Sequence, residues 1–304
     1  MIKIGISGLG RRGLTHLVSI SDKKDVQIFA FDPHFSEKED KTFQGVHFCS
    51  TFQGLLDKEI SGIIITSPDK YHYEQAILAI KSHIPILLEK PSCYSICELN
   101  KIISFSEKYK TPVYVGYQRR LFSIYQKVKK ILQDIPISDL LSIHCHIYSN
   151  IADNMEYASK LFFNTGCHYI DIINYLFPGN KKLLNSNLFF KDKKDTCGTA
   201  TLLLKNKIPV FITFELNSAV FPEICESQLV ICIKNRTIIL SQYGLKDINL
   251  LTKQINEEYQ NPAENNISNE FLSVVLGNKN EKMCKIQEDL ETISILENIY
   301  NKGK

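Results

Sequence analysis

The sequence has no long apolar run, no strong excess of charge and no low-complexity tract. No stretch approaches the roughly 18 apolar residues that a transmembrane helix needs, and the first residues, MIKIGISGLG, lack the regions of a secretory signal. A net charge of +3 over 304 residues gives no strong field for a nucleic acid. The lysine clusters at 127–130 and 191–194 are interrupted, as on solvated surfaces. We expect neither a nucleic-acid nor a membrane partner.

The sequence also lacks paired metal ligands, although it contains nine cysteines. Cys93 and Cys97 stand close together, but no second Cys or His pair lies near them in sequence, so we predict no metal site. An odd number of scattered cysteines without an export signal indicates free thiols in a reducing compartment. We therefore expect a cytoplasmic protein whose cysteines are mostly small buried side chains.

The length, about twice that of a typical domain, predicts two domains. The first part alternates short apolar runs with helical patterns. Several runs are continuous Ile/Val/Leu stretches, as in strands buried on both faces of a parallel sheet. Ser95 and Glu98 form a capping box that opens one of the helices. The runs lie at 2–7, 26–32, 46–50, 62–66, 85–89 and 112–117.

The pattern changes after about residue 120, where strands follow one another with short turns. Expected strands lie at 140–149, 199–205, 210–217, 228–234 and 237–242, expected helices at 121–134, 166–177 and 285–300, and the polar segment 256–269 is expected to be a loop. We predict an α/β Rossmann domain over residues 1–120. An α+β domain with an open, mostly antiparallel sheet follows over residues 121–304.

The first expected strand is followed by Gly8-Leu9-Gly10-Arg11-Arg12-Gly13, a G-x-G-x-x-G motif that opens a helix. Its glycines permit a tight turn and close approach of a pyrophosphate to the helix N-terminus. Asp32 ends the second strand about 20 residues further on, where a carboxylate binds the adenosine ribose. It would repel a 2′-phosphate, which favours NAD over NADP. A guanidinium from Arg11 or Arg12 could offset that repulsion.

Ligands of open α/β sheets bind beyond the carboxyl ends of the strands, which is where Glu89-Lys90-Pro91 stands. This tripeptide resembles the signature of the glucose-fructose oxidoreductase / inositol dehydrogenase / MocA family. Three further segments match in order and extend the resemblance over nearly the whole chain. They are Thr66-Ser-Pro-Asp-Lys-Tyr-His72, Val115-Gly-Tyr-Gln-Arg-Arg120 and Asn164-Thr-Gly-Cys-His-Tyr-Ile-Asp171.

The resemblance implies a Rossmann domain followed by an α+β domain, and a Lys90–Pro91 bond that is often cis in such proteins. It also implies that Lys90 and His168 are catalytic and act on a substrate hydroxyl or carbonyl. The expected cofactor contacts are Gly8, Leu9, Gly10, Arg11, Gly13, Asp32, Thr66, Ser67, Pro68, His72, Glu89, Lys90 and Gln118.

Independently of the family, Asn164, His168 and Asp171 share one face of a predicted helix. Histidine titrates near neutrality, so His168 is the natural proton-transfer group, and Asn164 and Asp171 are expected substrate contacts. Asn164 departs from the aspartate that the family carries, and an amide transfers no proton at pH 7. Tyr148 is a third expected substrate contact. It shares a strand face with His144 and His146, and that face meets either substrate or another subunit.

The leading hypothesis is an NAD(P)-dependent dehydrogenase or reductase acting on the CH–OH group of a sugar, nucleotide sugar or cyclitol. NAD is the expected cofactor, with NADP as the alternative. A second hypothesis is a non-catalytic dinucleotide-binding sensor or regulatory protein. A scaffold without cofactor is a third, and the intact glycine motif and Asp32 argue against it. The open sheet favours a homodimer or homotetramer.

Overall fold

The computed structural model describes residues 1–34, 45–150, 160–191, 194–205, 207–217, 226–259 and 266–302. The chain divides into two compact units. The first comprises Met1–Gln118 and Asn265–Leu290, and the second comprises Arg119–Glu264 and Glu291–Lys304. The predicted division at residue 120 places everything after it in one domain, whereas the structure returns Asn265–Leu290 to the first unit.

The first unit contains a seven-stranded sheet of order β15-β6-β5-β4-β1-β2-β3. All neighbouring strands pair in parallel except β15, which is antiparallel to β6. This confirms the predicted Rossmann fold. The strands are β1 (Ile2–Ser7), β2 (Val26–Phe31), β3 (Val46–Phe48), β4 (Gly62–Ile65), β5 (Ile86–Leu88), β6 (Val113–Val115) and β15 (Cys284–Lys285).

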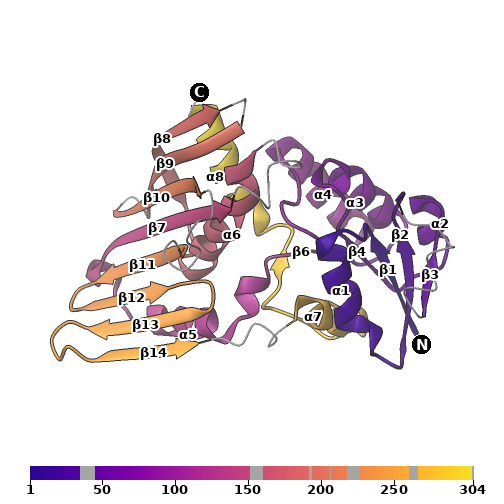
Figure 1. Ribbon diagram of the computed structural model, residues 1–304, viewed down its shortest axis with the longest axis horizontal. Coiled ribbons are helices and arrows are strands. Elements are labelled where there is room, and N and C mark those ends of the chain that lie inside the picture. Colours follow the sequence, from indigo (N-terminus) through magenta and orange to yellow (C-terminus); the bar gives the residue numbers. More distant parts are fainter. Residues whose placement is uncertain are drawn as a thin grey trace. The chain divides into compact units, whose positions relative to one another are not determined.

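Helices cover both faces of this sheet, as its continuous apolar strands predict. The consecutive residues Ile63, Ile64 and Ile65 of β4 are all fully buried, which requires cover on each face. The helices are α1 (Arg11–Ser21), α2 (Phe52–Leu56), α3 (His72–Lys81), α4 (Ile96–Tyr109) and α7 (Ile267–Val275). Figure 1 shows α1 beside α7 on one face and α3 beside α4 on the other. Ser95 caps α4 by accepting the Glu98 N–H at 3.2 Å, at the predicted position.

The second unit contains an eight-stranded open sheet of order β14-β13-β12-β11-β7-β10-β9-β8, with helices on one face (Figure 1). Only β7 and β10 pair in parallel, so the predicted mostly antiparallel sheet is confirmed. Its strands are β7 (Leu140–Asn150), β8 (Lys181–Lys191), β9 (Lys194–Leu204), β10 (Ile208–Asn217), β11 (Gln228–Ile233), β12 (Arg236–Leu240), β13 (Gly244–Asn249) and β14 (Ile255–Tyr259). Its helices are α5 (Ser123–Gln133), α6 (Leu161–Leu176) and α8 (Asp289–Lys302), whose first two residues belong to the first unit.

Several strands and one helix differ from the sequence-based expectation. The sequence predicts neither β8 nor β13, and β14 and α7 occupy much of the segment predicted as a loop. The edge strand β8 exposes most of its residues and shifts register twice against β9, so it lacks a regular alternation of apolar residues. In α7, Asn266 supplies the N-cap by accepting the Ser268 N–H at 2.9 Å.

The cysteines within the described ranges are free thiols, and five of them are buried. Burial raises the pKa of Cys93 and of Cys145 to about 12. Across the same ranges, we find no helix with the length and hydrophobicity needed to span a bilayer.

Candidate functional site

The expected cofactor residues of the first unit gather at one edge of its sheet. The strands from β1 to β6 run parallel, so their carboxyl ends share that edge, where open α/β sheets bind ligands. The residues that follow these strands are Gly8 after β1, Asp32 after β2, Thr66 and Ser67 after β4, Lys90 after β5 and Gln118 after β6. The buried Oε1 of Gln118 has no hydrogen-bond partner among the described residues.

The glycine motif forms a tight loop with free space where a pyrophosphate would approach. Gly8 has φ +92°, and an added Cβ there would lie 2.6 Å from the Ser67 nitrogen. A Cβ on Gly13 would lie 1.9 Å from the Gly8 carbonyl oxygen, so neither site accepts a side chain. A Cβ on Gly10 would meet nothing within 4 Å. Gly10 begins α1 without a side-chain cap, and the first turn has no acidic residue, so its N–H groups fit an anion.

Asp32 fixes this loop from the end of β2. Its Oδ2 accepts the Leu9 N–H at 2.7 Å, and its Oδ1 accepts the His34 N–H at 2.8 Å. An ionised carboxylate offers about four acceptor positions, so two bonds leave capacity for ribose hydroxyls. The loop and Asp32 together fit a dinucleotide whose ribose carries free hydroxyls.

Arg12 turns to a buried carboxylate, which bears on the choice between NAD and NADP. Its Nη2 donates to Glu89 Oε1 at 2.7 Å, and Glu89 is only 3% exposed. Burial raises the pKa of Glu89, but Arg12 and His16 more than offset this, and the pKa lies well below its usual range. Arg12 is therefore engaged with Glu89, whereas Arg11 is exposed.

Side-chain hydrogen bonds hold the loop after β4 in place. The Thr66 hydroxyl donates to the Gly8 carbonyl at 2.6 Å, and the Ser67 hydroxyl donates to Gln75 at 2.9 Å. His72 is 2% exposed, and its Nδ1 and Nε2 each lie 2.8 Å from a carbonyl oxygen, those of Pro91 and Ser67. Burial lowers the pKa of His72. We therefore correct the expectation that His72 contacts the cofactor: its buried ring supports the backbone of two loops.

Lys90 is half-buried, and the Lys90–Pro91 bond is cis, as the resemblance implies. The adjoining residues are anchored from the returning C-terminal segment. Asp289, which is fully buried, accepts the Ser92 hydroxyl at 2.5 Å and the Tyr117 hydroxyl at 2.9 Å. The sequence did not reveal Asp289, because nothing in its surroundings indicates that it meets β5 and β6.

Helix α6 carries the expected residues of the second unit. Asn164 and His168 are half-buried one turn apart, whereas Ile170 and Ile173 are fully buried, so the helix has the predicted polar face. Asp171 differs from the expectation. It is fully buried and accepts Arg120 Nε and Nη2 at 2.6–3.1 Å, so we assign it an ion pair in place of a substrate contact.

Tyr148 and the residue of β7 that contacts α6 lie on opposite faces of the strand. Side chains alternate along a strand, and the neighbouring Ser149 is within 3.1 Å of the Thr165 hydroxyl of α6. Tyr148 shares its face with His144 and His146, as predicted. The structure therefore separates Tyr148 from Asn164 and His168.

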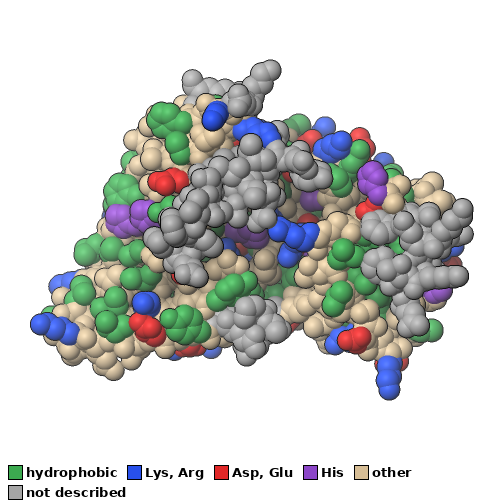
Figure 2. All heavy atoms as spheres, viewed as in Figure 1, with side chains coloured by type: hydrophobic (Ala, Val, Ile, Leu, Met, Phe, Trp, Pro, Cys, Tyr) green, Lys and Arg blue, Asp and Glu red, His purple; other side chains and the backbone are tan. Residues whose placement is uncertain are grey.

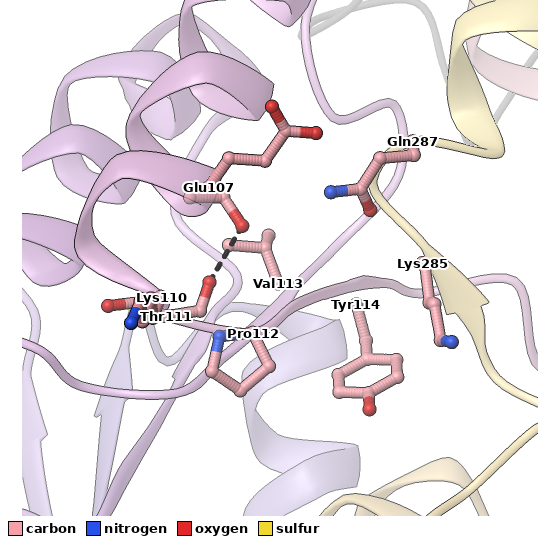
Figure 3. A pocket seen from close by; sticks show the side chains of 9 residues that line it. Glu107, Lys110, Thr111, Pro112, Val113, Tyr114, Lys285 and Gln287 are labelled. Atoms are coloured by element: carbon pink, nitrogen blue, oxygen red, sulfur yellow. Dashed lines mark hydrogen bonds between the residues drawn. The ribbon is translucent and has the colours of Figure 1, made fainter.

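A pocket of about 270 Å³ lies away from these residues. Figure 3 shows that its lining comes from the end of α4, the turn that follows, the start of β6 and the segment with Lys285 and Gln287. Burial raises the pKa of Tyr114 in its wall. The pocket adjoins the amino end of β6, opposite the carboxyl edge that carries the cofactor residues.

Comparison with known proteins supports the assignment of the first unit as an NAD-binding domain. Residues 2–117 match the model of GFO_IDH_MocA, described as an oxidoreductase family with an NAD-binding Rossmann fold. The match covers less than half of the chain and shows that its first part is similar to the NAD-binding Rossmann domain of that oxidoreductase family.

Two curated relatives extend the similarity beyond this domain. The chain is 27% identical over 249 residues to glucose-6-phosphate 3-dehydrogenase of Bacillus subtilis, covering 74% of this chain and 70% of that protein. It is 22% identical over 183 residues to inositol 2-dehydrogenase of Rhodococcus jostii, covering 58% of this chain and half of that protein. Among solved structures, the WlbA dehydrogenase of Bordetella pertussis, in complex with NADH and UDP-GlcNAcA, has a TM-score of 0.82 at 16% identity. The match covers 99% of this chain and 96% of that one, and it shows that the fold is shared.

Proposed function

We propose that the chain is an NAD-dependent dehydrogenase or reductase acting on a CH–OH group of a sugar, nucleotide sugar or cyclitol. A hydride passes between the substrate carbon and nicotinamide C4. The hydroxyl proton leaves as the carbonyl forms, and it returns in the reverse direction. Lys90 hydrogen-bonds the reacting oxygen, and His168 exchanges its proton. The substrate class comes from the relatives, whose names include a sugar-phosphate and an inositol dehydrogenase.

The observation that carries this proposal is the setting of Lys90. The lysine is half-buried at the edge that carries the glycine loop and Asp32, and the buried side chains of Glu89 and His72 contact the backbone of Lys90 and Pro91. A lysine that was merely exposed to solvent at the end of a strand would need no such support. The polar face of α6, with Asn164 and His168, supports the proton-transfer role in the second unit.

Asn164 favours a second candidate, a dinucleotide-binding sensor without turnover. An amide holds a substrate hydroxyl but cannot exchange its proton at neutral pH. Under this alternative the chain binds NAD and a sugar-like ligand, and the ligand changes the contacts that the protein makes with a partner.

One experiment separates the two candidates. The protein is incubated with NAD and a panel of sugars, sugar phosphates, nucleotide sugars and cyclitols while the absorbance of reduced nicotinamide is followed. An enzyme generates NADH with at least one compound. A sensor binds NADH, seen as a change in its fluorescence, and generates none with any compound.

We further propose a cytoplasmic homodimer or homotetramer. Residues of the second sheet that face away from the helices leave large apolar side chains exposed, among them Leu141 and Phe211, and the Phe211 ring stacks on that of His144. Figure 2 shows hydrophobic and histidine side chains together over these strands. A face of this composition favours association. Sedimentation of the purified chain tests it.

A further inference from the structure

Glu89 contacts two groups in addition to Arg12. His16 Nε2 lies 3.0 Å from Glu89 Oε1, the same oxygen that Arg12 contacts. The other oxygen, Oε2, accepts the backbone N–H of Lys90 at 3.3 Å. The carboxylate therefore joins helix α1 to the backbone of the lysine to which we assign the reacting oxygen.

The protonation of the His16 ring follows from its partners. A carboxylate only accepts, so Nε2 carries the proton that bonds Glu89. Nδ1 lies 2.8 Å from the Ser268 hydroxyl, which donates to this nitrogen when the ring is neutral. Both His16 and Ser268 are almost fully buried, at 2% and 1% exposure. Ser268, from α7, thereby keeps the ring oriented toward Glu89.

The packing leaves Glu89 little room to move. A Cβ on Gly116, at the end of β6, would lie 2.9 Å from Glu89 Oε1. The carboxylate is thus enclosed between the backbone of Gly116 and the side chains of Arg12 and His16. If the His16 N–H is removed, Arg12 alone holds Oε1 from α1, and the carboxylate is less firmly fixed in the position from which Oε2 accepts the Lys90 N–H.

We infer that His16 is a positioning residue for Lys90 and acts through Glu89, with Ser268 as its outer anchor. This inference rests on the proposed function for its kinetic consequences. Its structural consequence, a fixed Lys90 backbone, is independent of turnover. Displacement of a reacting group by about 1 Å costs up to about a hundredfold in rate, so a loosened Lys90 affects the chemical step more than binding.

Two variants of His16 test the inference. His16→Gln keeps an N–H that reaches Glu89, whereas His16→Leu removes it. His47→Leu is the matched control, because His47 is an exposed histidine of the same unit that contacts Gln27. In His16→Leu we expect kcat to fall about tenfold or more, while KM and NAD affinity stay within about threefold. His16→Gln recovers most of kcat, and His47→Leu behaves as wild type.

Hydrogen exchange of the Lys90 backbone amide is measured on the same proteins. We expect exchange to accelerate on the order of tenfold in His16→Leu, with β1 amides unchanged. Ser268→Ala, which keeps the ring, gives a smaller change in the same direction and serves if His16→Leu does not fold. A slow Lys90 amide in every variant overturns the inference, as does equal impairment of the Gln and Leu variants. If the wild type turns over no substrate, the proposed function fails, and the exchange data alone decide on His16.

Discussion

Arg120 binds Asp171 through two guanidinium nitrogens in the interior of the second unit. Nε lies 3.0 and 3.1 Å from the two carboxylate oxygens, and Nη2 lies 2.6 Å from Oδ1. The side chains are 3% and 0% exposed. Removing one partner of a buried pair leaves the other charge without compensation. We expect Asp171→Ala to lower the free energy of unfolding by about 3–5 kcal/mol, measured by urea denaturation.

The pair of Arg236 and Asp247 is the matched control. It has similar geometry, with nitrogen–oxygen distances of 2.6 and 2.8 Å, but its side chains are 33% and 17% exposed. Asp247→Ala should therefore lower the free energy of unfolding by about 1 kcal/mol or less. Equal losses in the two variants would contradict the structural role of Asp171.

The position of Asp171 shows where sequence reasoning stops. The helical spacing places Asn164, His168 and Asp171 on one face, and in the structure the first two are half-buried. Spacing alone does not reveal that the third residue of the stripe meets Arg120, because the periodicity of a helix carries no information about the element packed against it. In the same way, the alternation of side chains along β7 shows which residues share a face with Tyr148, but it does not show that α6 covers the opposite face.

The sequence predicts features that depend on a local motif, but it does not predict contacts between residues far apart in the chain. The glycine loop and Asp32 were predictable because each depends on a strand and the residues that follow it. The bond between His16 and Ser268 joins residues 252 positions apart, and Asp289 reaches Ser92 over 197. Such pairs arise only because Asn265–Leu290 returns to the first unit. No local sequence pattern predicts that this segment packs in the first unit.

Asp32 should make NAD bind more tightly than NADP. Its carboxylate pairs with free ribose hydroxyls and repels a 2′-phosphate. Asp32→Ala removes that repulsion and also releases the Leu9 N–H, so we expect weaker NAD binding and a smaller gap between the two cofactors. Calorimetric titration of both dinucleotides measures this. Asp22→Ala, an exposed aspartate at the far end of α1, is the control. Tighter NADP binding by the wild type would show that Arg11 decides the preference.

Lys90→Met should abolish hydride transfer while dinucleotide affinity stays within about an order of magnitude, because the lysine acts on the reacting oxygen and not on the phosphates. Steady-state rates and NADH fluorescence titration give the two quantities. Lys23→Met, in the exposed turn after α1, should match the wild type. Turnover at the wild-type rate in Lys90→Met would remove Lys90 from the mechanism.

Glu89 should make stability depend on pH in a definite direction. Its pKa in the folded protein lies below the value of about 4.3 expected for an unfolded chain. The stabilisation is therefore fully present above that pH and is lost as the pH falls toward the folded pKa. Wild type should be more stable than Glu89→Gln at pH 7, and the difference should shrink below about pH 4. Unfolding curves at several pH values measure it, and a difference that grows on acidification would contradict the assignment.

Asn164 and His168 should have unequal effects on turnover. If His168 exchanges the proton and Asn164 only orients substrate, His168→Ala should reduce kcat about a hundredfold or more, and Asn164→Ala substantially less. Asn164→Asp restores the family's carboxylate one helical turn from His168, which favours the protonated imidazole and moves the corresponding limb of the pH–rate profile to higher pH. Rates over a pH series test both expectations. A wild type that is inert toward every substrate, combined with activity that appears in Asn164→Asp, would contradict them. In that outcome the natural asparagine identifies a binding protein on an enzyme's fold, because restoring one proton-transfer group would have restored the chemistry.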